Sequence, residues 1–417
     1  MTMPTLTELM EEELRGFGES SARYLIRLRS SSDCREIVRG LRELREPGGC
    51  PAHQAEALPF INAVFLHLQS PEAFLHHPEV EGVERDEMLA VIQDKATRLS
   101  PGEIRRQASF ARSKPFIPWG IRHIQAPLAW KAATGQDIRI GVIDTGVDFS
   151  HPDLRDSIAG GINLIHRHLP PLDDNGHGTH ISGTIAAGAG QGMSGVAPHA
   201  KLYAVKAFDH NGTSFVTDIV KGIDWCVNHG IHIINMSFGM KSYSPSLESA
   251  VRNAAKEGVV IIASSGNEGK KGIIDYPARF PNTIAVGATG RNGKIAGFTN
   301  RSTQIDIYAP GERIVSTWLN GKYQELSGTS MATSHVSGVA ALMMALKPGI
   351  SLSMLLAGLQ RSAMPISSTA RKAGFLGEIN AIRAVRAISR KKQRSSQVRA
   401  RVQASAGPAA RIPISSR

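Results

Sequence analysis

The hydrophobic pattern of the first hundred residues changes its period several times. RYLIRLR alternates apolar and polar positions as a half-buried strand does, and INAVFLHLQ and VEGVERD predict two further strands. A helix is expected near residues 34–44, and a helical or loop stretch near 72–77. This alternation of strands and helices is typical of a small α+β domain, which we place at residues 20–92.

From Ile138 onward the chain carries continuous apolar runs of strand length instead. The runs are IRIGVID, KLYAVKAF, IHIINMSFG, GVVIIASSGN and NTIAVGAT. Helices are expected after His177, over 216–229 and over 247–257. Uninterrupted Val/Ile strands between helices predict a doubly wound, mostly parallel α/β sheet that is covered on both faces. In such a sheet the reactive side chains gather at the carboxyl ends of the strands.

The remaining segments are polar. One stretch before the α/β region is rich in Lys, Arg and Pro, which predicts an exposed linker. Beyond Ala381 the pattern fades into Ser, Arg, Gln, Ala and Pro, which predicts a disordered tail. The expected organisation is an N-terminal extension at 1–19, the α+β domain at 20–92, a linker at 93–117, an α/β domain at 118–388 and a basic tail at 389–417.

Composition limits the partners of this chain. Its 417 residues, 41% hydrophobic and 20% charged, are typical of a globular protein with a large core. No uncharged apolar stretch reaches the roughly 18 residues that a membrane span needs. The formal net charge is +12, but ten Lys or Arg and no acidic residue follow Ala381, which leaves +2 for the rest. The basic tail has no aromatic residue to stack on bases, so we expect no nucleic-acid partner.

The cysteines and the N-terminus bear on the compartment. Cys34, Cys50 and Cys226 are odd in number and widely spaced, which indicates neither a disulfide framework nor a metal-binding cysteine motif. The first residues carry several glutamates and no basic stretch followed by an apolar one, so no secretory signal is recognisable. This favours an intracellular protein, whereas an upstream start would allow secretion.

Three segments place reactive side chains where the predicted sheet gathers them. Asp144 ends a predicted strand. Taken alone, an aspartate at the end of a strand is also typical of a residue that starts a turn. His177 lies between two glycines that let the backbone approach closely, whereas His180, one turn later, is expected to be a satisfied histidine. Ser330 stands at the start of an apolar helix, either as an N-cap or as a nucleophile next to the positive end of the helix.

Together the three side chains point to one chemistry. A serine is a poor nucleophile until an imidazole takes its proton, and a carboxylate must hold that imidazole in the right tautomer. The chain order Asp, His, Ser is one of the three orders in which this triad recurs.

The blocks DTGVD, NGHGTHISGT and GTSMATSHVSG resemble the signatures of the subtilisin-like serine proteases. GVAPHAKLYAVKAF, INMSFG and ASSGNEG are similar to intervening family segments, so the resemblance runs from about Pro118 to Val385. It implies a monomeric serine endopeptidase that acts on protein and peptide substrates through an acyl-enzyme and needs no cofactor for catalysis. Ser330 would be the nucleophile, His177 the general base and acid, and Asp144 the group that orients His177.

The same resemblance implies an oxyanion hole. It assigns Asn267, in the SGNEG block, as an oxyanion donor together with the backbone N–H of Ser330. Taken alone, this asparagine is typical of a turn before Gly269. Substrate would bind extended between residues 237–239 and 211–214.

The pocket for the side chain before the scissile bond follows from the same blocks. Its floor would carry Asp275, which would favour Lys or Arg; an exposed loop position is equally compatible with this residue. The walls of the pocket would be Ser237, Gly239, Ser264 and Ser265.

The first domain resembles the inhibitor-like propeptide of these proteases, so the chain's own propeptide is an expected intramolecular inhibitor, with self-processing in the linker. Two features depart from the family. Ser334 replaces a proline that most members have, and GAGQGMSG is one residue shorter than the loop that helps to hold a structural calcium. Asp153 matches another calcium ligand. An inactive, peptide-binding member of the family is the alternative to an active protease.

Overall fold

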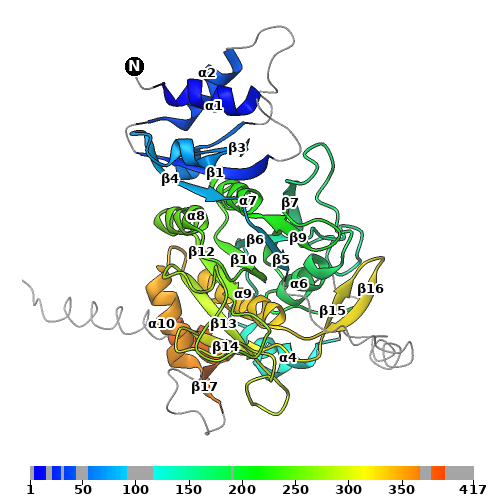
Figure 1. The fold of residues 1–417 in the computed structure, drawn as a ribbon. Helices are drawn as coiled ribbons and strands as arrows, with labels where there is room; N and C mark the ends of the chain where they lie inside the picture. The colour runs from blue at the N-terminus through cyan, green and yellow to red at the C-terminus, as the bar shows by residue number, and fades with distance from the viewer. Residues whose placement is uncertain are drawn as a thin grey trace, which may run out of the picture.

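The computed structural model describes residues 4–15, 21–29, 32–43, 55–91, 116–188, 192–366 and 377–389. Figure 1 shows a small N-terminal domain above a larger α/β domain. The predicted linker, as far as residue 115, and the predicted tail from residue 390 lie outside the described residues. Within the described part, no helix has the length and apolar character needed to cross a membrane.

The N-terminal domain is one antiparallel sheet with helices on one face. Its strands pair in the order β2-β3-β1-β4. Its elements are α1 (Leu6–Arg15), β1 (Ala22–Leu28), α2 (Cys34–Glu43), β2 (Glu56–Leu58), the 3-10 turn η2 (Pro59–Ile61), β3 (Ala63–Leu68), the 3-10 turn η3 (Pro71–Phe74) and β4 (Val80–Arg85).

Helix α1 belongs to this domain, although the sequence suggests a separate N-terminal extension over 1–19. Leu6, Met10 and Leu14 are at most 1% exposed and join the core of the small sheet. Thr5 and Glu8 exchange hydrogen bonds that cap the start of the helix. The i, i+4, i+8 spacing of the apolar positions and this capping box were present in the sequence.

The α/β domain is built on a nine-stranded sheet in the order β17-β18-β14-β13-β12-β10-β6-β8-β7. All neighbours are parallel except β17 and β18, which confirms the predicted mostly parallel α/β fold. Its strands are β6 (Arg139–Asp144), β7 (Ile158–Asn163), β8 (Lys201–Lys206), β10 (Ile233–Met236), β12 (Val260–Ser264), β13 (Thr283–Thr289), β14 (Ile307–Pro310), β17 (Met364–Pro365) and β18 (Gly377–Glu378).

Helices cover both faces of this sheet. α6 (His177–Ala186) and α9 (Thr329–Leu346) pack together on one face, and α7 (Val216–Asn228) and α8 (Pro245–Lys256) on the other. Further elements are α4 (Trp119–His123), α5 (Ala126–Ala129), β9 (Thr213–Phe215), β11 (Phe238–Gly239), the hairpin β15 (Ile314–Trp318) and β16 (Lys322–Leu326), and α10 (Leu352–Ser362); residues 381–389 are also helical.

The predicted strand runs and helices correspond to real elements, but β7 and the β15–β16 hairpin were not anticipated. β7 reads IAGGIN, and its two glycines interrupt the apolar run that marks the other strands. A Cβ on Gly161 would lie 2.2 Å from the carbonyl oxygen of Ala204, so the glycine allows the close approach of β8.

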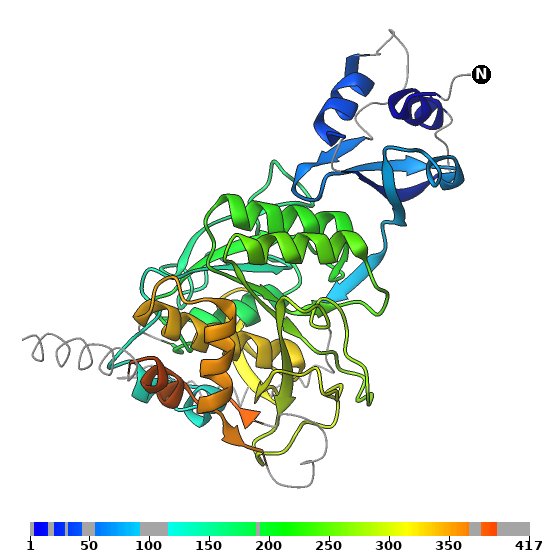
Figure 2. The same cartoon turned by 90° about the vertical axis from the view of Figure 1, so that its left-hand side faces the viewer.

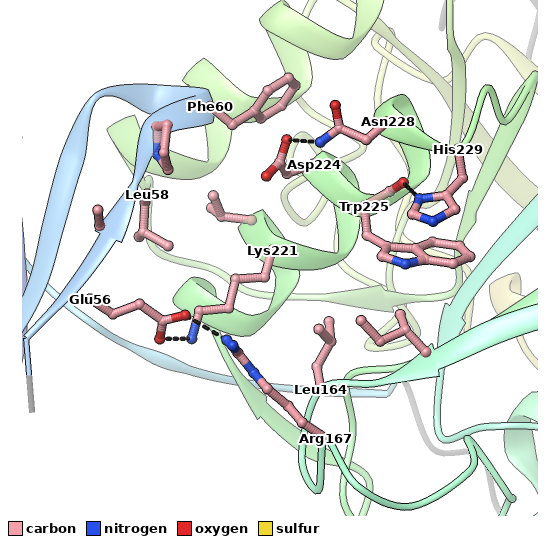
Figure 3. Close-up of a pocket in the computed structure, with 14 residues that line it drawn as sticks. Glu56, Leu58, Phe60, Leu164, Arg167, Lys221, Asp224, Trp225, Asn228 and His229 are labelled. Carbon is pink, nitrogen blue, oxygen red and sulfur yellow. Dashed lines mark hydrogen bonds and ion pairs between the residues drawn. The ribbon is translucent and has the colours of Figure 1, made fainter. Parts of the chain in front are cut away.

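The two domains meet through the sheet of the small domain, which packs on α7 and α8. Leu25, Leu58 and Phe65 belong to one apolar cluster with Ile219 and Val251 of these helices. Beside this contact lies a cavity of about 290 Å³ between β2 and α7. Glu56 lies at its edge and pairs with Lys221 and Arg167 (Figure 3). The ion pairs are 2.6 Å and 2.5 Å long, respectively.

After the small sheet the chain continues into the strand β5 (Met88–Val91), which leaves the N-terminal domain and runs along the larger one (Figure 2). β5 lies between β11 and β9 and pairs antiparallel with both. Leu89 and Val91 face inward and are 4% and 2% exposed, whereas Met88 faces solvent. The end of the N-terminal domain is therefore held as a strand on the α/β domain.

Candidate active site

Asp144 and His177 form a buried pair at the carboxyl edge of the sheet. Asp144 is the last residue of β6 and His177 the first of α6. The Nδ1 of His177 lies 2.7 Å from Oδ1 of Asp144, and the two side chains are 6% and 0% exposed. A hydrogen bond from Nδ1–H to the carboxylate fixes the tautomer in which Nε2 is the basic nitrogen.

The two glycines beside His177 are needed for this geometry. A Cβ on Gly178 would lie 2.1 Å from the carbonyl oxygen of Gly146, and one on Gly176 would lie 2.4 Å from the ring of Trp318. Gly176 also has φ 107, a left-handed conformation that other residues rarely adopt. The prediction that these glycines permit close backbone approach agrees with both contacts.

Asp173 holds the loop before α6, and sequence analysis did not single it out. It is 6% exposed. Its carboxylate accepts hydrogen bonds from the backbone N–H groups of Asn175, Gly176 and Thr179 and from the hydroxyls of Thr145 and Thr179. A negative charge at the start of a helix is favourable, and here it also fixes the approach of His177. The only signal in the sequence is its place in DDNGHG.

Ser330 is the second residue of α9 and is fully buried. Ser330 contacts Ser237, the residue directly after β10, and β10 is the parallel neighbour of β6, at whose end Asp144 contacts His177, so the helix starts that carry His177 and Ser330 lie at the same edge of the sheet. The hydroxyl of Ser330 donates to the carbonyl oxygen of Ser237 at 3.0 Å. Ser334, at the position of the family proline, bonds back to the carbonyl of Met331 at 2.7 Å and leaves α9 continuous.

Asn267 lies beside the start of α9. Its Oδ1 accepts hydrogen bonds from the backbone N–H of Thr329 at 3.0 Å and from the hydroxyl of Thr329 at 2.8 Å. With Oδ1 held in this way, the NH₂ end of the amide is the part that can donate to a developing oxyanion. The structure thus brings Asn267 next to Ser330.

The five predicted pocket residues lie close together. Ser264 donates to the carbonyl of Phe238, and the N–H of Asp275 donates to the carbonyl of Ser265. Gly239 pairs with Ala90 of β5. The carboxylate of Asp275 approaches the loop after β12, since a Cβ on Gly266 would lie 2.5 Å from its Oδ2. Ser237 contacts Ser330, as described above.

Burial and nearby charges shift the pKa values of two carboxylates in this pocket, Asp275 and Glu268. Burial, and then the negative charge of Glu268, raise the pKa of Asp275 to about 6. Burial also acts to raise the pKa of Glu268, but hydrogen bonds from Asn300 and Lys241 outweigh it and hold the pKa below its usual value. Lys241 lies 3.0 Å from Glu268.

Two carboxylates of the N-terminal domain cap the helices beneath it. Glu84 accepts from the hydroxyl of Ser244 and, at 3.0 Å, from the N–H of Ser246 at the start of α8. Asp86 accepts from the N–H of Thr217 at the start of α7, at 2.9 Å, and pairs with Arg23 at 2.7 Å. Helix N-termini favour negative charge, so the two contacts fix the approach of β5.

His180 is a buried core histidine, as expected, but only one of its ring nitrogens is hydrogen-bonded, because the buried Nδ1 has no partner among the described residues. Its Nε2 lies 3.0 Å and 3.1 Å from the carbonyl oxygens of Ile314 and Gln324. Burial, and then the charge of His177, lower its pKa to about 3, so it stays neutral.

Residues 135–397 match the sequence model of a protein family that is described as Subtilase family. This chain belongs to the subtilase family. It is 37% identical over 364 residues, covering 87% of this chain and 88% of the relative, to an alkaline protease of Alkalihalobacillus alcalophilus. It is 44% identical over 255 residues, covering 61% and 93%, to Subtilisin Savinase of Lederbergia lenta. Subtilisin E of Bacillus subtilis (strain 168) is 34% identical over 345 residues, covering 81% and 84%.

The predicted family and enzyme class are therefore confirmed: this subtilase is a subtilisin-type serine endopeptidase. Propeptides and zymogens are typical of the family, and catalysis in subtilases needs no cofactor.

The surroundings of Asp153 do not fit a calcium ligand. Its Oδ1 accepts from the N–H of Gly192 at 3.0 Å, and its Oδ2 accepts from the N–H of Met193 at 2.8 Å and from the hydroxyl of Tyr323 at 2.6 Å. Hydrogen-bond donors direct positive charge at the carboxylate, whereas Ca²⁺ requires several oxygen ligands around it. Within the described residues no cluster of three or more His, Cys, Asp or Glu could hold a metal.

We therefore predict that Tyr323, rather than calcium, stabilises the carboxylate of Asp153. Tyr323→Phe removes one donor from a buried acceptor and should lower the free energy of unfolding by about 1–3 kcal/mol. Any effect of calcium, relative to EDTA, on the melting temperature should be the same in the wild type and in Asp153→Asn. A saturable rise of the melting temperature with calcium, lost in Asp153→Asn, would contradict this.

Proposed function

We propose that Asp144, His177 and Ser330 are the catalytic triad of this subtilase and that Asn267 is its oxyanion donor. The observation that carries the proposal is the buried 2.7 Å pair of Asp144 and His177 at the sheet edge where α9 presents Ser330. The hydroxyl of Ser330 turns from Ser237 toward the imidazole when substrate binds. Nε2 of His177 takes the proton as Oγ attacks the peptide carbonyl.

Negative charge then develops on the carbonyl oxygen of the substrate. The NH₂ group of Asn267 and the backbone N–H of Ser330 donate to this oxyanion. Asp144 stabilises the imidazolium, which gives its proton to the leaving amine and produces the acyl-enzyme. Water, activated by the same imidazole, hydrolyses the ester and regenerates Ser330. His180 remains neutral nearby and adds no charge to compete with the imidazolium.

Two variants test these roles. Ser330→Ala should abolish peptide hydrolysis and labelling by a fluorophosphonate probe while circular dichroism stays unchanged. Asn267→Ala should lower kcat by about 10²- to 10³-fold, the range for one oxyanion donor, which was established on a subtilisin. Near-normal hydrolysis by the Ser330 variant would refute the triad. A wild-type protein that the probe does not label would favour an inactive, peptide-binding subtilase.

The N-terminal domain is proposed to be an inhibitory propeptide. Strand β5 occupies the position expected for an extended substrate, paired with β11 and β9. Val91, its last described residue, donates its N–H to the carbonyl of Gly212 at 2.9 Å. A strand held there excludes other peptides, and a scissile bond just beyond it would release the domain.

Self-processing and inhibition can be measured together. The wild type should cut itself between residues 92 and 117, and Ser330→Ala should stay full length by mass spectrometry. Added back, the segment 1–92 should inhibit the mature enzyme. Asp86→Asn should raise the inhibition constant about 10-fold or more, because it weakens a charge-assisted bond worth about 1.5–3 kcal/mol.

The matched control is Glu81→Gln in the same domain. Glu81 pairs with Arg27 and its side chain is 54% exposed, so its loss should leave inhibition nearly unchanged. Equal effects of the two variants would show that capping of α7 does not hold the propeptide.

Specificity is proposed to depend on Asp275 at the floor of the pocket for the side chain before the scissile bond. Ser264 and Ser265 lie beside it, and Glu268 adds a second negative charge. A Lys or Arg side chain entering this site would form a charge-assisted pair. The protease is therefore expected to be broad, with a preference for basic residues.

The preference should depend on pH. Asp275 is anionic above its pKa of about 6 and neutral below it, so the Arg-to-Phe ratio of kcat/KM should rise about 10- to 100-fold between pH 5 and 8. Matched peptides ending in Arg or Phe provide the measurement. Asp275→Asn, which keeps the size of the side chain, should flatten the rise; the same rise in this variant would place Asp275 outside the pocket.

A further inference from the structure

Asn300 is a fully buried residue whose entire hydrogen-bonding capacity goes to one loop. Its Oδ1 accepts from the N–H of Glu268 at 3.1 Å and from that of Lys270 at 3.0 Å. Its Nδ2 donates to the carbonyl of Ser265 at 3.2 Å and to the carboxylate of Glu268 at 2.8 Å. A side-chain amide can make four such bonds, and all four hold residues 265–270.

This loop has no regular secondary structure of its own. Two of its residues, Gly266 and Gly269, have φ of 100 and 67, so it departs from both strand and helix. The backbone of Asn300 and its neighbours adds three bonds. The N–H of Asn300 donates to Gly266, that of Gly269 to Phe298 and that of Arg301 to Lys270.

The loop carries Asn267 between the residues that Asn300 holds. Gly266, on one side, donates to the hydroxyl of Thr329 at 3.3 Å, and the same hydroxyl donates to Oδ1 of Asn267. Glu268, on the other side, is held through both its N–H and its carboxylate. A displacement of either neighbour therefore moves the side-chain amide of Asn267.

We propose that Asn300 is a positioning residue that fixes Asn267 for oxyanion stabilisation and, through the same amide, fixes Glu268 beside Asp275. The proposal rests on the oxyanion role of Asn267 proposed above. Asn300 contacts no substrate atom in this assignment; it acts through the loop. Misplacement of a catalytic group by about 1 Å can cost about 10²-fold in rate, so a large effect on kcat is expected.

A double-mutant cycle separates positioning from general stability. Asn300→Ala should lower kcat about 10- to 100-fold with less than about threefold change in KM for a peptide ending in Phe. In an Asn267→Ala background, Asn300→Ala should lower kcat less than about threefold, because the donor that Asn300 positions is absent. Rates are taken on mature enzyme, normalised to sites titrated with a fluorophosphonate.

Asn163 provides the matched control. It is 4% exposed, lies at the end of β7, and its amide holds another loop through the N–H groups of Ile165 and His166 and the carbonyl of Pro170. Asn163→Ala should lower the melting temperature, but its effect on kcat should be the same with and without Asn267. If the effect of Asn300→Ala is also the same in both backgrounds, the inference is overturned.

Asn300→Asp keeps the shape of the side chain and provides the test if the alanine variant does not fold. It retains the acceptor for Glu268 and Lys270 but places a negative charge near Glu268 and Asp275. Their pKa values should rise, so the pH at which the Arg preference appears should move above the wild-type value. An unmoved transition would overturn the placement of Asn300. If Asn267→Ala leaves kcat unchanged, the oxyanion role of Asn267, on which this proposal rests, is refuted instead.

Discussion

The close approach of α6 to the end of β6 is the constraint on which the site depends. Gly178 has no room for a side chain between the carbonyl of Gly146 and Asp144, and this contact places His177 within hydrogen-bonding distance of Asp144. Because the parallel strands all end at this edge, the starts of α6 and α9 reach the same place. The buried carboxylate then serves as the partner of an imidazole rather than as an isolated buried charge, which would be costly.

The N-terminal domain contacts the outer surface of the α/β domain near the same edge of the sheet. Its sheet packs on α7 and α8, and Asp86 and Glu84 satisfy backbone donors at the starts of these helices. α7 has no side-chain cap of its own, because Phe215 stands at its N-cap. Apolar contact, capping and strand addition thus act together to place β5, each through surface that the folded protease presents.

The charges around Asp275 depend on the geometry of a single loop. Glu268 and Asp275 lie close enough for the charge of one to raise the pKa of the other, and Lys241 partly neutralises them. The loop that carries Glu268 also carries Asn267 and is held by the buried amide of Asn300. With the roles proposed above, substrate preference and oxyanion stabilisation would be coupled through this short segment, because Asn267 and Glu268 are adjacent in it.

The sequence by itself determined the fold class and the candidate triad, because continuous apolar runs mark buried parallel strands and the blocks around Asp144, His177 and Ser330 are local in the chain. It did not reveal β7, whose glycines break the apolar run, or the attachment of α1 to the first domain. Only the tertiary structure decided which polar residues outside these blocks form hydrogen bonds with their neighbouring loops. Asn300 and Asp153 are bound by partners thirty or more residues away, and hydrogen bonds between such distant segments leave no periodicity in a single sequence.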